Sequence, residues 1–260
     1  MNSEQPSSVW PGLKGRRVLV TGAGSGIGRA VALALGRSGA SVGLHYHASA
    51  GGAGETAAAI DAAGGQAWLL RGDLADTAVR DRLVDDFVAV AGGLDVLVNN
   101  AGIVADYADF RELSEAAWLD TFAVNVQAPF WLCRAAWPHL AAAGGGRIIN
   151  ISSAAVGFGG SARNMHYTAS KAALEGLTIA LAKEGAPVGI LVNAIRCGLI
   201  ESGMHLRVPG YDEERYRRRA AEVPLGRAGR PEEVAAMVAV LASEEGGFIT
   251  GQVIAIAGGD

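Results

Sequence analysis

Tyr167 and Lys171 are the side chains whose types and spacing most directly suggest chemistry. They lie four positions apart in a helical segment, so both project from one face of the helix. A free tyrosine has a pKa of about 10, and an adjacent ammonium group favours the phenolate and lowers that pKa. Because a general acid or base works best with a pKa near the working pH, we expect Tyr167 to exchange a proton with a carbonyl oxygen or an alcohol.

A glycine-rich turn, Thr21-Gly-Ala-Gly-Ser-Gly-Ile-Gly28, follows the first apolar segment. Glycines permit a tight turn and let the backbone approach a phosphate closely, and the free N–H groups and dipole of the next helix stabilise that phosphate. Such a turn between the first strand and the first helix of a β–α–β unit is typical of a nucleotide-binding site.

Seven short apolar segments, which we predict as strands, alternate with longer helical patterns. The strand segments are 17–21, 41–46, 66–70, 95–98, 147–151, 189–193 and 252–256, and the helical segments are 30–35, 55–63, 77–91, 114–143, 167–184, 212–222 and 231–241. We expect Pro129 and Pro138 to interrupt the fourth helical segment. Strands without polar alternation are buried on both faces, and strict strand–helix alternation places helices on both sides of a parallel sheet. The predicted fold is therefore α/β, a Rossmann-type doubly wound, seven-stranded parallel sheet that binds ligands at the carboxyl ends of its strands.

Composition excludes several classes of protein. Half of the 260 residues are hydrophobic and 18% are charged, which excludes a disordered chain. The net charge of −4 does not fit a general nucleic-acid binder. No apolar run is long enough to span a membrane, and the N-terminus does not resemble a secretory signal. We expect one domain over residues 1–260, with a flexible tail over residues 1–12.

The cysteines and histidines indicate neither disulfides nor a metal. Cys133 and Cys197 are the only cysteines, too few for a disulfide framework or a multi-thiolate site. The five histidines lack the spacing of metal ligands, so each is expected to be a pocket or surface residue. A soluble, cytoplasmic protein without a metal site is predicted.

Five motifs in order resemble those of the short-chain dehydrogenase/reductase family, from about residue 13 to residue 260. They are the glycine-rich turn, Asp95-Val-Leu-Val-Asn-Asn-Ala-Gly102, Asn125 within Val-Asn-Val, Ile148-Ile-Asn-Ile-Ser-Ser153, and Tyr167-x-x-x-Lys171. The resemblance implies an NAD(P)(H)-dependent oxidoreductase (EC 1.1.1.-) that interconverts a carbonyl and a secondary alcohol by hydride transfer. Tyr167 would be its general acid or base.

The resemblance also implies a catalytic set of Asn125, Ser153, Tyr167 and Lys171. Ser153 would hydrogen-bond the substrate oxygen, although the adjacent Ser152 is an alternative. Asn125 would lie at a helix break and hold a water in a proton relay. Tyr167 follows Ser153 by 14 positions, one more than is common in the family, so we expect an altered pocket rather than lost catalysis.

The expected cofactor is NADP(H), with NAD(H) as a possibility. Strand two ends at Tyr46 and His47 without the carboxylate that would bind a ribose 2′-hydroxyl, and Arg29 is a candidate for contacting a 2′-phosphate. The cofactor-binding residues implied are Gly22, Gly24, Ser25, Gly26, Ile27, Gly28, Tyr46, His47, Ser49, Asp73, Leu74, Asn100, Ala101, Gly102, Tyr167, Lys171, Gly198, Ile200 and Ser202. Cys197 replaces the family's proline, and we expect it to pack rather than react.

The predicted substrate pocket is mostly apolar. Its expected residues are Val156, Phe158, Met165, Met204 and His205. A lid is predicted over residues 203–222, with residues 204–206 facing the substrate. The cationic run 215–219 is expected in solvent, although it could instead meet a phosphate or an acidic partner.

The branch of the family that looks nearest is 3-oxoacyl-carrier-protein reductase, so that activity is an alternative. A non-catalytic dinucleotide sensor is an alternative of another class, and the complete Asn–Ser–Tyr–Lys set argues against it. The remaining expectations are a small carbonyl or alcohol as substrate, no nucleic-acid or membrane partner, and a homotetramer or homodimer.

Overall fold

The seven predicted strands form one fully parallel sheet in the computed structural model, which describes residues 10–208 and 212–260. The strands are β1 (Arg17–Val20), β2 (Ser41–Tyr46), β3 (Gln66–Arg71), β4 (Val96–Asn99), β5 (Gly146–Ser153), β6 (Ile190–Cys197) and β7 (Val253–Ile256). Their order is β3-β2-β1-β4-β5-β6-β7, and each neighbouring pair is parallel. The predicted doubly wound α/β fold is confirmed.

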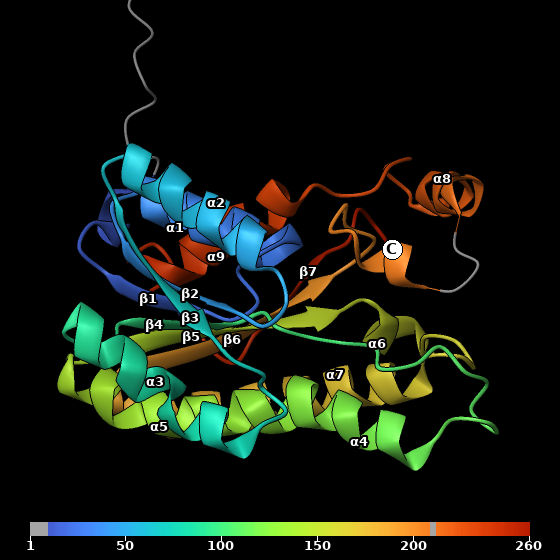
Figure 1. The fold of residues 1–260 in the computed structure, drawn as a ribbon, viewed down its shortest axis with the longest axis horizontal. Helices are drawn as coiled ribbons and strands as arrows, with labels where there is room; N and C mark the ends of the chain where they lie inside the picture. The colour runs from blue at the N-terminus through green and yellow to red at the C-terminus, as the bar shows by residue number, and fades with distance from the viewer. Residues whose placement is uncertain (1–9, 209–211) are drawn as a thin grey trace, which may run out of the picture.

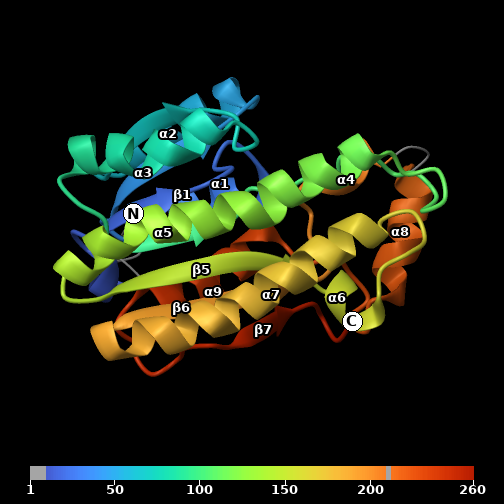
Figure 2. The ribbon, with the colours of Figure 1, turned by 90° about the horizontal axis from the view of Figure 1, so that it is seen from below.

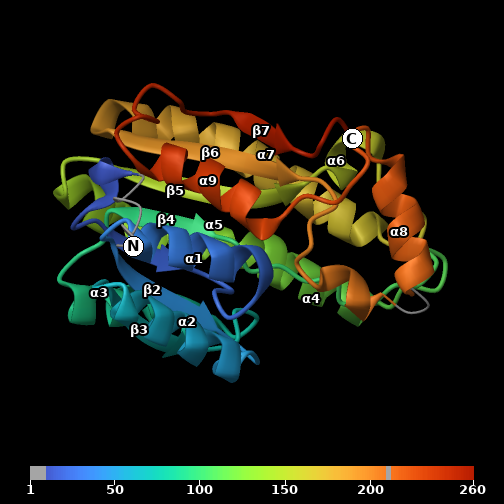
Figure 3. The same cartoon turned by 90° about the horizontal axis from the view of Figure 1, so that it is seen from above.

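Helices cover both faces of the sheet (Figure 1). One layer holds α1 (Gly26–Arg37), α2 (Ala50–Ala62) and α9 (Pro231–Ala242), and the other holds α3 (Thr77–Ala91), α4 (Glu115–Phe122), α5 (Ala128–Ala142) and α7 (Met165–Gly185). Figure 2 shows α4, α5 and α7 over one face of the sheet, and Figure 3 shows α1, α2 and α9 over the other. The short α6 (Ala155–Phe158) and the charged α8 (Glu213–Glu222) lie beyond the carboxyl ends of the strands.

The central strand β1 is apolar at its buried positions because both of its faces are covered. Side chains alternate between the faces of a strand: Val18 and Val20 belong to the cluster that packs with α1 and α9, whereas Leu19 belongs to the cluster with α3 and α5. All three are fully buried. A polar side chain at any of them would lose hydration without a partner.

The sheet order places a ligand crevice at a defined point. Strand β1 lies between β2 and β4, so the chain winds outward in opposite directions from it. The turns that follow β1 and β4 separate there and leave a crevice at the carboxyl ends of the strands, which is where open α/β sheets bind ligands.

The helical segment 114–143 differs from the prediction. It is not interrupted at the prolines: Pro129 lies in the first turn of α5, directly after a π-helical turn, and Pro138 lies inside the same helix. The regular helix is instead interrupted by a π-helical turn over Ala123–Gln127. The second predicted helix also starts earlier than expected, at Ala50.

Part of the predicted terminal tail belongs to the packed structure. Trp10 packs against the core and Pro11–Leu13 form a 3₁₀ helix, η1, which ends at the fully buried Leu13; residues 10–12 are therefore not a flexible tail. The rest of the predicted tail, residues 1–9, and residues 209–211 of the predicted lid lie outside the described residues. Within the described part of the chain, no helix is both long enough and apolar enough to cross a bilayer.

Candidate active site

A cavity of about 800 Å³ opens at the carboxyl ends of the strands. Its wall is formed by the segments 22–27 after β1, 46–49 at the end of β2, 73–75 after β3, 100–103 after β4, 153–155 at the end of β5 and 198–202 after β6. The predicted sites on these segments therefore meet at one crevice although the sequence separates them widely.

Most of the predicted site residues line this cavity. Those that do are Gly22, Gly24, Ser25, Gly26, Ile27, Tyr46, His47, Ser49, Asp73, Leu74, Asn100, Ala101, Gly102, Ser153, Phe158, Tyr167, Lys171, Gly198, Ile200, Ser202 and Met204. Gly28, Asn125, Val156 and Met165 do not line it. The side chain of His205 lies outside the described residues.

The glycine-rich turn leaves the first turn of α1 uncapped at the cavity. Ser25 is the N-cap residue, but its side chain makes no capping hydrogen bond. Gly26 has φ +51°, in the left-handed region, and a Cβ there would lie 2.8 Å from the Ser202 carbonyl oxygen. The exposed N–H groups and the helix dipole suit an anion, so this turn fits the diphosphate of a dinucleotide.

Gly28 allows the turn to pack closely and does not itself line the cavity. It is buried, and a Cβ there would lie 2.2 Å from the Gly22 carbonyl oxygen. The side chain of Asn100 is also committed to the turn, because its Nδ2 donates to the carbonyl oxygen of Thr21 at 2.8 Å. The hydroxyl oxygen of Thr21 in return accepts the N–H groups of Asn100 and Ala101, both at 3.0 Å. These bonds join the turns after β1 and β4.

His45 holds the same turn from the other side, and the sequence analysis did not assign it a role. Its Nδ1 accepts the N–H of Gly22 at 3.3 Å, and its Nε2 lies 3.1 Å from the carbonyl oxygen of Gly72. These partners require neutral imidazole with the proton on Nε2. The residue is 2% exposed, and burial lowers its pKa to about 4.

The end of β2, which lies on the cavity wall, carries no carboxylate. Tyr46, His47 and Ser49 line the wall there, and His47 Nε2 lies 3.9 Å from an oxygen of Asp73. Arg29, a predicted candidate for phosphate contact, instead pairs with Glu55 at 3.2 Å and does not line the cavity. This prediction is wrong because the guanidinium is directed to α2.

Ser153, Tyr167 and Lys171 lie together in the cavity wall. The Ser153 hydroxyl is hydrogen-bonded to Tyr167. Lys171 Nζ lies 5.8 Å from the centroid of the Tyr167 ring and donates to the Ile151 carbonyl oxygen at 2.8 Å. A hydroxyl, a phenol and an ammonium group therefore converge where a substrate oxygen could lie.

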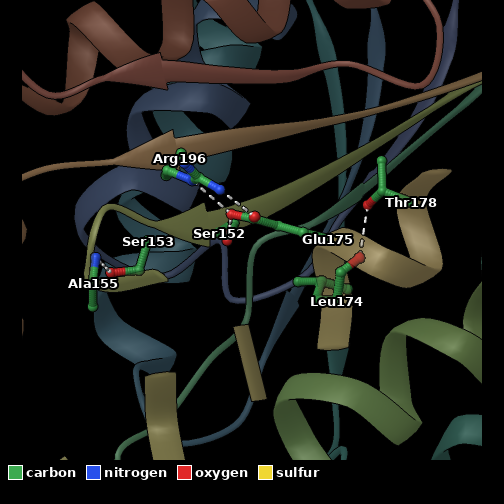
Figure 4. Close-up of polar contacts among 7 residues, drawn as sticks. All are labelled: Ser152, Ser153, Ala155, Leu174, Glu175, Thr178 and Arg196. Atoms are coloured by element: carbon green, nitrogen blue, oxygen red, sulfur yellow. Dashed lines mark hydrogen bonds and ion pairs between the residues drawn. The ribbon is translucent and has the colours of Figure 1, made fainter. Parts of the chain in front are cut away.

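Ser152, the alternative to Ser153, also lines the cavity, but its hydroxyl is directed at Glu175 (Figure 4). Its hydroxyl donates to Glu175 Oε1 at 2.7 Å. Arg196 on β6 donates two hydrogen bonds to the same carboxylate, from Nε at 2.9 Å and from Nη2 at 2.5 Å. Glu175 is only 7% exposed. The triplet fixes the ends of β5 and β6 to α7, so the geometry favours Ser153 as the substrate-facing serine.

Helix α7 is joined to β5 by a polar ladder, which we define as the residue pairs Tyr167–Ser153, Lys171–Ile151, Glu175–Ser152 and Thr178–Asn150. The helix members follow at intervals of four, four and three residues, which keeps them on one helical face. The last pair joins Asn150 Nδ2 to Thr178 Oγ1 at 2.8 Å, and both residues are fully buried.

Burial shifts the two titratable catalytic candidates in opposite directions. It raises the pKa of Tyr167 to about 12, although the hydrogen bond from Ser153 opposes the shift, and it lowers the pKa of Lys171 to about 8. The expectation of a lowered tyrosine pKa is wrong for the chain alone, because desolvation of the phenolate is the larger effect. A neutral phenol is the form that can donate a proton.

Asn125 lies behind the cavity wall, in the π-helical turn Ala123–Gln127. Its amide exchanges hydrogen bonds with the backbone of Ile103, at 2.8 and 2.9 Å, and donates to Ser170 Oγ at 2.9 Å. The predicted helix break is therefore present at this residue. Its observed contacts join the segment after β4 to α7, and a proton-relay role for it stays a prediction.

Cys197, at the end of β6, is buried at the cavity wall. Burial raises the pKa of its thiol to about 12, although the charge of Lys171 opposes the shift. A thiol with so high a pKa is a poor nucleophile. Packing is thus the role that its surroundings support.

The substrate end of the cavity is more polar than predicted. Phe158 and Met204 line it, but Tyr107, Ser161, Arg163, Asn164, Arg215 and Arg219 do so as well. The expectation that the whole run 215–219 lies in solvent is therefore wrong, and Leu206, expected to face the substrate, is 71% exposed. Val156 is half-buried outside the cavity and Met165 is exposed at the start of α7.

Two signals in the sequence could have identified part of this polar wall. Arg163 and Asn164 lie four and three positions before Tyr167, so they must be near any site built on that tyrosine. Arg215 is separated from Arg217 by two positions, which places them on different faces of a helix. Tyr107 carries no comparable signal, because it lies in the irregular segment between β4 and α4.

Comparisons with known proteins match almost the whole chain. A family model described as Enoyl-(Acyl carrier protein) reductase matches residues 22–260. An uncharacterized oxidoreductase of Thermotoga maritima is 41% identical over 249 residues, which are 95% of this chain and 97% of the relative. A cis-4-hydroxycyclohexanecarboxylate dehydrogenase of Sinomonas cyclohexanicum is 38% identical over 94% of this chain and 96% of the relative. A 3-oxoacyl-[acyl-carrier-protein] reductase of Staphylococcus aureus is 36% identical over 94% and 97%.

Solved structures also include dehydrogenases that match almost the whole chain. A short chain dehydrogenase from Burkholderia cenocepacia, crystallised in complex with NADP, superposes with a TM-score of 0.86 at 36% identity. The match covers 95% of this chain and 98% of the other.

The buried His45 predicts an acid-sensitive fold. Its folded-state pKa of about 4 lies below the unfolded value of about 6.5, so between these values the unfolded chain binds more protons. This contribution to stability is complete above pH 6.5 and is lost as the pH falls toward 4, with about 2 kcal/mol lost between pH 7 and pH 5. Urea unfolding at both pH values should show that loss in the wild-type protein and a smaller one in His45→Asn. Equal losses in the two proteins would contradict this role.

Proposed function

This chain belongs to the short-chain dehydrogenase/reductase family, and we propose that it is an NADP(H)-preferring member that interconverts a ketone and a secondary alcohol. It is an oxidoreductase of the class that acts on CH–OH groups with a nicotinamide dinucleotide (EC 1.1.1.-). The observation that supports our assignment of the catalytic residues is the convergence of Ser153, Tyr167 and Lys171 in the cavity wall.

In this proposal, the nicotinamide cofactor supplies or accepts the hydride at the substrate carbon. During reduction, Tyr167 gives its hydroxyl proton to the carbonyl oxygen, and Ser153 donates a hydrogen bond to the same oxygen as negative charge develops on it. Lys171 stabilises the phenolate that remains, and its further task is to hold the ribose hydroxyls of the cofactor. During oxidation the same groups act in reverse, with the phenolate taking the alcohol proton.

The uncapped start of α1 and the glycine-rich turn would hold the cofactor diphosphate. The backbone of Ile200 and the hydroxyl of Ser202, both on the cavity wall, would meet the nicotinamide end. The preference for NADP(H) rests on the end of β2, where Tyr46, His47 and Ser49 present no carboxylate to repel a 2′-phosphate. The crystallised relative from Burkholderia cenocepacia carries NADP, which supports this choice.

Reduction of 3-oxoacyl groups on a carrier protein remains the alternative activity. It is supported by the relative from Staphylococcus aureus, which has that name. The description of the matching family model also names an acyl carrier protein, but with an enoyl group. The relative from Sinomonas cyclohexanicum is named for a hydroxycarboxylate instead. Both names describe chemistry at a secondary alcohol or ketone, so they share the reaction and differ in the substrate.

We propose in addition that the protein is a cytoplasmic homotetramer. Helices α4, α5 and α7 cover one face of the sheet (Figure 2) and expose Trp118, Leu119, Phe130, Trp131 and Ile179. Large exposed apolar patches often mark association surfaces. Light scattering should give a mass near four times that of the 26.6 kDa chain, and a monomer mass would contradict the proposal.

The proposed cytoplasmic location is supported by the cysteines. Cys133 and Cys197 are free thiols, as expected in a reducing compartment.

Replacement of Tyr167 by Phe tests the catalytic assignment. The variant should bind NADPH as the wild type does but lose about 10²- to 10⁴-fold in kcat, the usual contribution of a general acid. Oxidation of NADPH, followed at 340 nm with a panel of ketones, quinones and acyl thioesters, measures this loss and identifies the substrate class. Circular dichroism and NADPH titration control for folding. A variant within threefold of the wild-type kcat would contradict the assignment.

The cofactor preference is tested at the end of β2. We expect kcat/KM to be higher with NADPH than with NADH. Tyr46→Asp should reverse the preference, because its carboxylate would repel a 2′-phosphate and accept a hydrogen bond from a free 2′-hydroxyl. Tyr46→Asn, of similar size and without charge, is the control and should shift the ratio less. Wild-type protein that uses NADH as well as NADPH would overturn this interpretation of β2.

A further inference from the structure

We propose that the substrate end of the cavity recognises an oxyanion, a carboxylate or a phosphate, carried by the substrate away from its reacting carbon. The proposal deepens the function proposed above and rests on it. It depends on the segment 160–164, which leads into α7, and on the cavity-facing side of α8.

Arg163 presents an oriented guanidinium to this end of the cavity. Its Nε and Nη2 both donate to the Tyr107 carbonyl oxygen, at 3.2 and 2.8 Å. These two bonds fix the plane of the group and leave Nη1 and the second proton of Nη2 as donors. No ion pair joins Arg163 to a carboxylate in residues 10–208 and 212–260. A guanidinium held in one plane is suited to a planar or tetrahedral oxyanion.

Of the two neighbouring polar side chains, Asn164 offers a further donor, whereas Ser161 has already donated its hydroxyl proton. Asn164 Oδ1 already accepts the N–H and the hydroxyl of Ser161, at 2.7 and 3.0 Å. The Asn164 amide NH₂ is then the polar end left for a ligand. Ser161 and Asn164 both line the cavity beside Arg163. A substrate group that accepts hydrogen bonds from both the Arg163 guanidinium and the Asn164 amide fits this segment.

The opposite wall is provided by α8, whose four arginines divide between two environments. Arg217 and Arg218 pair with Glu213 and Glu214 one turn earlier, whereas Arg215, which is also exposed, and Arg219 line the cavity. Arg219 pairs with Asp260, so this pair adds little net charge.

Carboxylates near this end work against an anion. Asp120, exposed on α4, lines the cavity, and Asp109, which pairs with Arg111, also lies within electrostatic reach of Arg163. Both weaken the positive field but contribute no hydrogen-bond donor. The cofactor phosphates are expected at the turns after β1 and β2, whereas Arg163 immediately precedes the catalytic helix. The donors of segment 160–164 are therefore available to the substrate.

The test compares ketones that carry an anionic group with neutral counterparts that share the same reacting ketone. The probes are 4-oxopentanoate, 5-oxohexanoate and 6-oxoheptanoate, each beside its methyl ester, and dihydroxyacetone phosphate beside dihydroxyacetone. With NADPH saturating, we expect at least one anion to have a kcat/KM about tenfold or more above that of its neutral counterpart, the effect of one charge-assisted hydrogen bond. A difference in a keto-acid pair would indicate a carboxylate site, and a difference in the dihydroxyacetone pair would indicate a phosphate site.

Variants then assign the effect to Arg163. Arg163→Gln should lower kcat/KM for the anion more than for the neutral counterpart, mainly through KM. Arg217→Gln removes the same charge from the outer face of α8 and should leave the ratio unchanged. Asp120→Asn should raise the ratio. An equal loss in Arg163→Gln and Arg217→Gln would indicate long-range attraction, as for an acidic carrier protein, and would overturn the proposal.

A binding measurement separates this inference from the proposed function. Calorimetry of the NADP⁺-loaded protein with each anion and its neutral counterpart needs no turnover. Equal binding of both, or binding unaffected by Arg163→Gln, overturns the oxyanion site whether or not the ketones react. If the neutral ketones react but the anions have no advantage, only the inference fails. If no ketone reacts although an anion binds through Arg163, the proposed reaction fails and the site stands.

Discussion

The attachment of α7 to β5 is the constraint on which the rest of the site depends. Four successive positions on one face of the helix bond to the last four residues of the strand, from Thr178–Asn150 deep in the core to Tyr167–Ser153 at the cavity. Hydrogen bonds between buried groups are costly to leave unmade, so this polar ladder fixes both the register and the rotation of α7. The glycine-rich turn has a comparable support in His45 and Asn100. The catalytic groups and the expected cofactor are thus held by separate sets of bonds on neighbouring strands.

Burial gives the catalytic pair its chemical character. A tyrosine with a raised pKa and a lysine with a lowered pKa are both displaced toward their neutral forms, because removal of water penalises either charge. A positive group bound nearby would favour the phenolate and disfavour the ammonium. The protein therefore supplies a proton donor whose acidity depends on what else occupies the cavity. Ser153 and Lys171 are placed to stabilise the negative charge on the substrate oxygen and on the phenolate.

The sequence predicted the parts of this protein that depend on local pattern. The apolar strands, the glycine-rich turn and the Tyr167/Lys171 spacing lie where we expected them, because each is determined by side-chain periodicity or by short-range geometry. The predictions that failed depend on distant contacts. The shift of the Tyr167 pKa is set by everything packed around it, and the pairing of Arg29 with Glu55 joins two helices. Arg163 and Arg215 reach one cavity from segments 52 positions apart. Pro138 inside α5 shows that tertiary packing overrides a local helix-breaking preference.

The most direct test of the central claim is the single-turnover rate of hydride transfer in Glu175→Gln and Glu175→Leu. Glutamine keeps an acceptor for the Ser152 hydroxyl, whereas leucine removes that step of the polar ladder without touching a catalytic group. The account predicts that the glutamine variant retains most of the rate. It predicts that the leucine variant loses roughly ten- to hundredfold, the cost of a small misplacement of reacting groups, with NADPH affinity little changed. A leucine variant that transfers hydride at the wild-type rate would contradict the claim that this ladder aligns the catalytic residues.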